Sequence, residues 1–287
     1  MDDPQAPAGE PVETVVVVEE IDEVDSGGNG GGGGMLWDEP FDALLRTIAE
    51  FIGAFFFFFI GIGAGVSISI AGEPSLLVVA LANGLALAIA VTALGHISGG
   101  HFNPAVTIGF LVTRRIAPLL AVMYIVAQLL AGIAAAAMVR WLWPGTFAKA
   151  AGYGAPALDP GLSSGEGLVL EALPTAFLVF VVFATAADIR GAFKIIAGFA
   201  IGLTVSVDVM VGGPLTGAMM NPARAFGSHV VDNTWSNAWI WYVGPILGGA
   251  IAALLYELLY LRPLRPAPPG LPESSVDEES VAVAALE

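Results

Sequence analysis

Residues 95–109 read GHISGGHFNPAVTIG, and residues 216–227 read TGAMMNPARAFG. Both stretches contain the triplet Asn-Pro-Ala, which occupies Asn103, Pro104 and Ala105 and again Asn221, Pro222 and Ala223. Asn is a preferred N-cap residue and Pro is favoured at the first helical position, so each triplet predicts the start of a helix. About ten helix-compatible residues follow, or roughly 15 Å of helix, about half of a bilayer core. We therefore expect two half-helices.

The composition indicates a membrane protein. Hydrophobic residues make up 56% of the 287 residues and charged residues only 13%, whereas about a quarter of the residues in a soluble domain are charged. The formal net charge is −16, but the acidic residues gather in 2–25 and 273–287, which we interpret as solvated tails. This balance disfavours nucleic acid as a partner. Without cysteine there is no disulfide and no Cys-containing metal site.

The chain divides into three parts by composition. We predict a disordered acidic and Gly-rich tail at 1–40, a membrane domain at 41–262, and a disordered Pro-rich acidic tail at 263–287. The membrane domain contains six apolar stretches of spanning length, near 43–70, 75–95, 117–140, 165–187, 194–212 and 237–260. The half-helices fall between the second and third stretches and between the fifth and sixth.

The distribution of Lys and Arg predicts the orientation. With the N-terminus inside, seven residues are cytoplasmic: Arg46, Arg114, Arg115, Arg190, Lys194, Arg262 and Arg265. Arg140 and Lys149 fall outside, so the count obeys the positive-inside rule. We expect an integral multi-pass protein of the cell (plasma) membrane with both termini cytoplasmic.

The spans also repeat. Glu50 lies 53 residues before Asn103, and Glu171 lies 50 residues before Asn221. Because three spans per copy reverse the direction of the second copy, residues 41–141 and 165–262 form an inverted repeat. The predicted fold class is an all-α membrane protein with six transmembrane helices plus two re-entrant half-helices in an inverted 3+3 repeat. The half-helices then meet N-terminus to N-terminus at the midplane.

This arrangement favours a passage for neutral solutes. Non-helical backbone at membrane depth is tolerated where it lines a water-filled cavity or is buried in protein. Two helix N-termini place partial positive charge at the centre, and the amides of Asn103 and Asn221 add donors there. A water that accepts from both amides is unable to accept from a neighbouring water in the file at that point, and cations meet a dipole barrier.

Four further side chains have an assigned role in this scheme. Glu50 and Glu171 are intramembrane acids, and we interpret each as an acceptor for backbone N–H groups of the bent loops rather than as a proton relay. His96 and His101 frame the first loop, where loop hydrogen bonding is favoured over a pH gate. We find no nucleophile-base pair, phosphate loop or metal-ligand cluster, so we expect no enzyme, no cofactor and no metal.

These residues resemble the major intrinsic protein family, the aquaporins and aquaglyceroporins, over about 41–262. The resemblance implies an aquaporin-like hourglass, a homotetramer in membrane lipid and one pore per subunit. It also implies an outer selectivity filter of Asn83, Val209, Ala218 and Arg224, of which Arg224 directly follows the second triplet. Strict water channels of the family usually carry Phe and His where this chain has Asn83 and Val209. The ring is therefore expected to be wider and to have one donor fewer.

The resemblance predicts a passive water channel with a relaxed filter that admits glycerol, urea, ammonia or hydrogen peroxide. Ala225 and the pair Trp241-Tyr242 point toward water, because glycerol facilitators of the family tend to carry Asp after the filter arginine and to lack this aromatic pair. Three alternatives stay open: a glycerol or small-polyol facilitator, an ion- or proton-coupled secondary transporter using Glu50 and Glu171, and an adhesive membrane array. Asp208 beside Val209 has three candidate places: paired with Arg224, facing a neighbouring subunit, or at the surface near the outer mouth.

Overall fold

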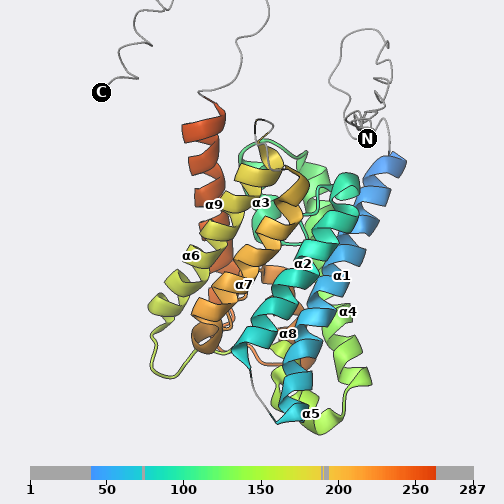
Figure 1. Ribbon diagram of the computed structural model, residues 1–287, viewed down its shortest axis with the longest axis vertical. Helices are drawn as coiled ribbons and strands as arrows, with labels where there is room; N and C mark the ends of the chain where they lie inside the picture. The colour runs from blue at the N-terminus through green and yellow to red at the C-terminus, as the bar shows by residue number, and fades with distance from the viewer. Residues whose placement is uncertain (1–39, 73–74, 189, 191–193, 263–287) are drawn as a thin grey trace, which may run out of the picture. The chain divides into compact units, whose positions relative to one another are not determined.

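The computed structural model describes residues 40–72, 75–188, 190 and 194–262, and within these ranges every regular element is a helix (Figure 1). The predicted tails lie outside the described residues, apart from Pro40. The long helices are α1 (Pro40–Ala71), α2 (Leu76–Ser98), α4 (Pro118–Leu142), α6 (Ser164–Val182), α7 (Ala197–Thr216) and α9 (Ile240–Tyr256). The short ones are α3 (Pro104–Val112), α5 (Gly145–Ala150), η1 (Gly152–Gly154), η2 (Phe183–Ala187), η3 (Lys194–Ile196), α8 (Pro222–Asp232) and η4 (Glu257–Leu261).

Six helices are long and apolar enough to cross a membrane, if η2 is joined to α6 and η4 to α9. Each coincides with a predicted span, which confirms the predicted fold class. The ends of α2 and α7 differ from the prediction, since these helices continue to Ser98 and Thr216. Each then stops at a glycine in the left-handed conformation, Gly99 with φ 94° and Gly217 with φ 86°. Gly adopts this conformation without a Cβ penalty and is the usual residue at such helix ends.

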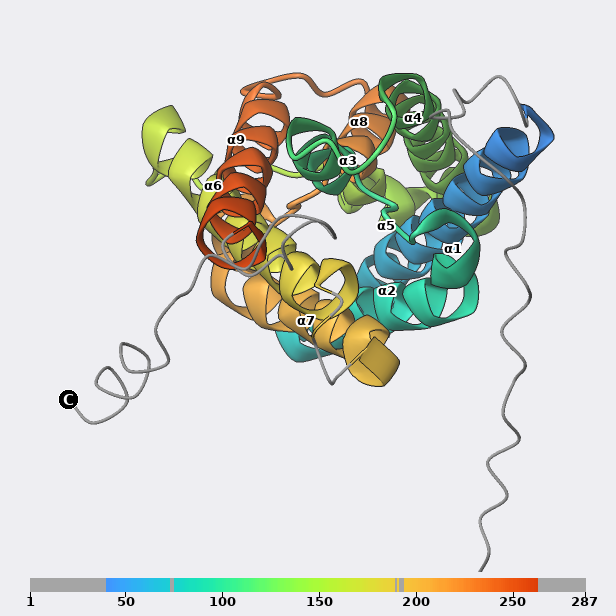
Figure 2. The same ribbon diagram turned by 90° about the horizontal axis from the view of Figure 1, so that it is seen from above.

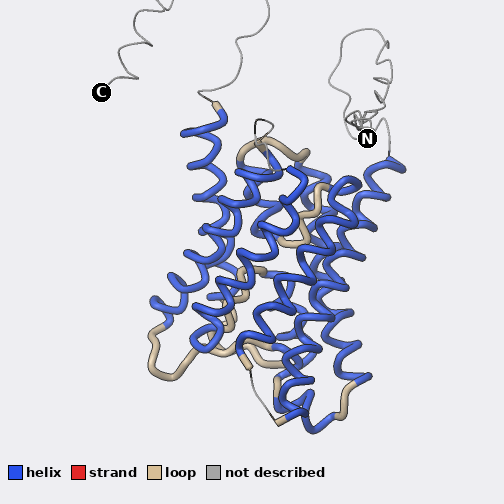
Figure 3. The backbone as a smooth tube through the Cα atoms, viewed as in Figure 1, coloured by secondary structure: helices blue, strands red, loops and turns tan. Residues whose placement is uncertain are grey.

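The short helices α3 and α8 are the predicted half-helices. Asn103 caps α3, with its Oδ1 accepting from Ala105 N at 2.8 Å. Asn221 caps α8, with its Oδ1 accepting from Ala223 N at 3.0 Å and from the amide of Arg224. Figure 3 shows non-helical segments within the depth of the bundle, where the chain leaves α2 and α7 and enters these half-helices.

The two halves of the chain pack against each other through equivalent glycines. Half-helix α8 packs on α4 and α3 packs on α9, so each half-helix contacts the third long helix of the other half (Figure 2). Figures 1 and 2 both place α2 beside α7. Gly84 and Gly202, each 19 residues before its Asn, meet at this contact. A Cβ on Gly202 would lie 2.7 Å from Ala88 Cβ and 2.8 Å from Ala88 N, closer than real Cβ atoms approach.

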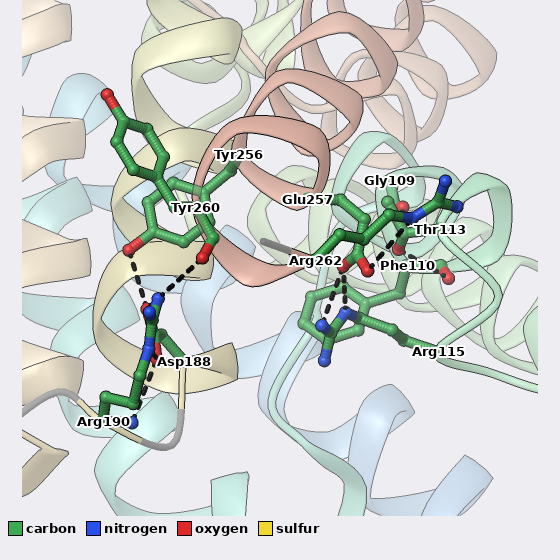
Figure 4. A network of polar contacts seen from close by, with 10 residues as sticks. All are labelled: Gly109, Phe110, Thr113, Arg115, Asp188, Arg190, Tyr256, Glu257, Tyr260 and Arg262. Carbon is green, nitrogen blue, oxygen red and sulfur yellow. Dashed lines mark hydrogen bonds and ion pairs between the residues drawn. The ribbon is translucent and has the colours of Figure 1, made fainter. Parts of the chain in front are cut away.

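We call the face where α1 begins and η4 ends the terminal face, and the opposite face, where α5 lies, the α5 face. A polar network lies at the terminal face. At the terminal face Glu257 is buried, and Arg115 donates to its Oε2 from Nε at 2.8 Å and from Nη2 at 2.7 Å (Figure 4). This pair connects the α3–α4 turn to the end of α9.

Tyr256, the last residue of α9, connects a second turn, the one between η2 and η3. Asp188 accepts from Arg190 Nε at 2.9 Å and from Tyr256 OH at 3.2 Å, while Arg190 also donates to Tyr260 O at 3.1 Å (Figure 4). The hydrogen bonds from Arg190 hold the pKa of the Asp188 carboxyl well below its usual range, against the opposing effect of burial. The end of α9 and the start of η4 are therefore hydrogen-bonded to both of these turns.

We predict that Gly202→Ala destabilises the protein by about 1–3 kcal/mol, because the added methyl overpacks the α2–α7 contact. Gly65→Ala in α1 is the matched control, since no heavy atom lies within 4 Å of a Cβ built there. The control variant is expected to be more stable than the wild type by roughly 0.5–1 kcal/mol, because Ala has a higher helix propensity than Gly. Thermal unfolding in detergent, followed by far-ultraviolet circular dichroism, compares the two; equal midpoints would contradict the close contact.

We predict that Asp188→Asn lowers the midpoint of thermal unfolding at pH 7 by about 3 °C, the shift expected for about 1 kcal/mol in a chain of this size. A lowered pKa means that the stabilisation is present above the unfolded value of about 3.9 and is lost as the pH falls. The difference between variant and wild type should therefore shrink below about pH 4. A difference that stays constant down to pH 2.5 would exclude ionisation of Asp188 as its cause.

Candidate functional site

The two loops that precede the half-helices have the same backbone conformation. Positive φ values occur in three equivalent pairs: Gly99 and Gly217, Gly100 and Ala218, Phe102 and Met220. A positive φ is uncommon for a residue with a Cβ and persists when the surroundings impose it. Phe102 at 46°, Ala218 at 43° and Met220 at 53° are such residues. The loops are therefore held in place by their surroundings.

Glu50 holds the first loop. Its Oε1 accepts from His101 N at 2.8 Å and from Ser98 Oγ at 2.7 Å. Its Oε2 accepts from Phe102 N at 2.7 Å and from Gln128 Nε2 at 2.8 Å. The carboxyl is completely buried, so these four donors replace the water that it would otherwise bind.

Glu171 holds the second loop in the same way. Its Oε1 accepts from Thr216 Oγ1 at 2.7 Å and from Met219 N at 3.0 Å, and its Oε2 accepts from Met220 N at 2.9 Å. Thr216 Oγ1 also accepts from Ala218 N at 3.2 Å, as Ser98 Oγ does from the equivalent glycine of the first loop. Because the carboxylates take the loop N–H groups, the loop carbonyls are the backbone groups left to face a solute.

The two capping asparagines reach across to each other's loop. Asn103 Nδ2 donates to Met220 O at 2.8 Å, and Asn221 Nδ2 donates to Phe102 O at 2.9 Å. Each amide has two N–H groups, so one donor on each side remains for a solute. Both side chains line a central cavity of about 20 Å³. This volume is enough for a single water.

The central cavity is otherwise mainly apolar. Phe57, Leu87, Leu178, Ile201 and Val205 are among its lining residues. An apolar wall offers a water no second set of partners, so the asparagine amides and the loop carbonyls determine how it is oriented. The N-termini of α3 and α8 add partial positive charge at the same point.

The four predicted filter residues lie together in a second cavity of about 30 Å³, toward the α5 face. It is lined by Asn83, Val209, Ala218 and Arg224, together with Met219. Asn83 Nδ2 donates to Val79 O of its own helix at 2.8 Å. The Arg224 guanidinium donates from Nη1 to Met219 Sδ, and its buried Nε has no hydrogen-bond partner. This second cavity, which we call the filter cavity, therefore contains a positive charge and a hydrogen-bond donor available to a solute.

Two histidines differ from each other in placement. His96 is exposed on the last turn of α2, and no hydrogen bond of its side chain occurs among the described residues. His101 is buried, with its Nδ1 3.1 Å from Thr107 Oγ1 and its ring against Tyr124. Of the two histidines expected to support the first loop, the described contacts assign this role to His101 and not to His96.

Asp208 is buried on α7 with only 6% of its surface exposed. Its Oδ2 has no hydrogen-bond partner, and no ion pair between Asp208 and Arg224 occurs in the described part of the chain. The suggested pairing with Arg224 is therefore wrong, and so is the suggested surface position.

Some site residues were not predicted from the sequence. The hydroxyls of Ser98 and Thr216 each lie five residues before the capping Asn, and this equal offset is a signal that could have found them. Trp241 Nε1 donates to Thr216 O at 2.9 Å, which fixes the second loop from a further side. Met219 also escaped prediction, because its position depends on the bent backbone around it. Within the described ranges, no group of three or more His, Cys, Asp or Glu is placed to hold a metal ion.

Comparisons with known proteins identify the family and the fold of this chain. The family model for the major intrinsic proteins matches residues 39–256. "Probable aquaporin TIP3-2" of Arabidopsis thaliana is 47% identical over 187 residues, which cover 65% of this chain and 68% of that protein. "Probable aquaporin TIP-type" of Medicago truncatula is 42% identical over 227 residues, covering 77% and 88%. The solved aquaglyceroporin from Plasmodium falciparum matches with a TM-score of 0.71 at 24% identity, covering 77% of this chain and 98% of that one, a likeness of fold.

We predict that Glu171→Gln lowers the osmotic water permeability per protein by about tenfold, in line with losing a buried hydrogen-bonded charge worth about 1.5–3 kcal/mol. The amide nitrogen cannot accept from a loop N–H, so the carbonyls of the second loop lose their orientation. Glu166→Gln is the matched control on the same helix, because Glu166 is exposed and caps α6. Stopped-flow shrinkage of proteoliposomes measures both variants; equal permeability would show that Glu171 does not orient the loop.

Proposed function

This chain belongs to the major intrinsic protein family, and we propose that it is a passive membrane channel that conducts water along an osmotic gradient and excludes protons and ions. One observation carries the proposal. Asn103 and Asn221 reach across to opposite loops over a cavity with room for one water, at the point where two helix N-termini meet. The family consists of channels, so we expect no catalytic activity.

The geometry supports conduction without proton transfer. A water in the central cavity accepts from the free N–H groups of the two asparagines, which uses both of its lone pairs and turns its hydrogens toward the two ends of the passage. It then cannot accept a hydrogen bond from either neighbouring water, so the chain of waters is interrupted for a proton. Arg224 and the partial charges at the starts of α3 and α8 repel cations.

We further propose that the filter is relaxed. Asn83 and Val209 stand where the family's strict water channels carry Phe and His, so glycerol, urea, ammonia or hydrogen peroxide are candidate additional permeants. A glycerol or small-polyol facilitator is the second candidate function, favoured by these same two residues. An ion-coupled transporter is less favoured, because Glu50 and Glu171 are occupied by hydrogen bonds from the loops.

The membrane arrangement is part of the proposal. We place the protein in the cell (plasma) membrane with both termini cytoplasmic. The orientation follows from the sequence count, which assigns seven Lys and Arg to that side against two to the other. Arg115, Arg190 and Arg262 belong to the network of the terminal face, which is then the cytoplasmic face. We also propose a homotetramer in membrane lipid. Large apolar side chains are exposed along α2 and α7, among them Leu85 and Leu203, and are available for lipid or neighbouring subunits.

Stopped-flow light scattering of proteoliposomes tests the function. An impermeant osmolyte should shrink vesicles with the protein faster than empty vesicles, and flux should not depend on a membrane potential. Glycerol re-swelling should be slower than the water-driven shrinkage. Glycerol uptake as fast as water efflux would favour the facilitator, and potential-dependent uptake would favour the transporter.

We predict that the double variant Asn83→Phe/Val209→His lowers glycerol permeability by about tenfold while changing water permeability by less than about threefold. The aromatic ring and imidazole fill the filter cavity, which narrows it more for a polyol than for water. Leu173→Phe in α6 is the matched control, because Leu173 is exposed and lines none of the cavities of the passage. Unchanged glycerol flux in a correctly folded double variant would refute the filter assignment.

A further inference from the structure

Met219 lies where three cavities of the passage meet. A mouth cavity of about 670 Å³ opens on the α5 face and is followed by the filter cavity and the central cavity. Met219 lines all three, whereas Arg224 lines the mouth and the filter, and Asn221 only the centre. A solute that moves from the mouth to the asparagines therefore passes Met219.

The backbone of Met219 is fixed while its side chain extends toward the mouth. Glu171 Oε1 accepts from Met219 N at 3.0 Å, which holds the residue from behind. The methyl end of the side chain lies beside Gly217, the first residue of the second loop, since a Cβ built on Gly217 would be 3.0 Å from Met219 Cε. Met219 belongs to one buried apolar cluster with Ile240 and Trp241. Methionine has three rotatable bonds, so it takes this position because these contacts define it.

The sulfur of Met219 is bound to the filter arginine. Arg224 Nη1 donates to Met219 Sδ. No ion pair of Arg224 occurs among the described residues, and its buried Nε has no hydrogen-bond partner. The thioether is therefore the side-chain acceptor that orients the guanidinium. In return, the guanidinium holds the thioether at the filter.

We infer that Met219 is a fifth residue of the filter, which narrows the opening that Asn83 and Val209 leave wide and positions Arg224 through its sulfur. The inference rests on the proposed function, because it concerns which solutes the same passage admits. A thioether has no donor and is only a weak acceptor, so it does not replace the hydrogen bonds with water that a polyol loses on entering the filter. The solutes that Met219 excludes are those with a carbon chain too wide to pass beside it.

Two variants separate the volume of this side chain from its sulfur. Met219→Ala removes both, and we expect the ratio of glycerol to water permeability to rise about tenfold. Met219→Leu keeps nearly the same volume but has no sulfur, so Arg224 loses its acceptor; we expect the ratio to rise about threefold, less than in the Ala variant. Met210→Ala is the matched control, because Met210 is an exposed methionine of α7 that lines none of these three cavities.

The ratio is measured on one preparation of proteoliposomes, with an impermeant osmolyte for water and a glycerol gradient for glycerol. Because both fluxes come from the same vesicles, a loss of folded protein lowers both and leaves the ratio unchanged. An Ala variant with the wild-type ratio would overturn the inference. A Leu variant equal to the wild type would refute the role of the sulfur, and one equal to the Ala variant would refute the role of volume. A wild-type protein without water flux would instead contradict the proposed function.

Discussion

A backbone that leaves the helix at membrane depth has to find acceptors for its N–H groups, and two buried carboxylates provide them here. Glu50 binds the amides of the first loop and Glu171 those of the second, each with help from a hydroxyl at the end of the preceding helix. The loop carbonyls and the asparagine amides depend on this support for their direction. Without it, the non-helical backbone would leave buried donors unsatisfied, at a cost of several kcal/mol each.

The inverted repeat makes the two halves depend on each other. Each capping asparagine donates to a carbonyl of the other half, and each half-helix packs on a long helix of the other half. The α2–α7 contact, where Gly84 meets Gly202, joins equivalent positions. A half of this chain on its own would therefore expose both the amide donors and the glycine surfaces. The passage is a property of the whole described bundle, and neither repeat contains it.

Much of the fold and of the pore centre could be predicted because the two halves of the sequence contain the same motif at matched spacing. Asn103 and Asn221 with their prolines mark helix starts by local chemistry, and the apolar stretches mark the spans by length. Side-chain placement in the loops was harder. His96 was expected to frame the first loop together with His101, but α2 continues to Ser98 and leaves His96 on an exposed helix surface. The burial of His101 and the direction of Met219 follow from positive φ values at neighbouring residues, which no apolar pattern reveals.

The symmetry of the backbone does not extend to the side chains, and this difference places the filter on one face. Arg224 lies three residues after its Asn, and the equivalent residue of the first half is Val106. Met219 lies two residues before its Asn, and the equivalent residue is His101, whose ring is engaged with Thr107. The charge and its sulfur partner therefore stand only on the side of the second half, toward the α5 face. In the proposed channel the symmetric centre orients a water, whereas the asymmetric filter cavity selects which molecules reach it. The two functions depend on different residues and can be altered separately.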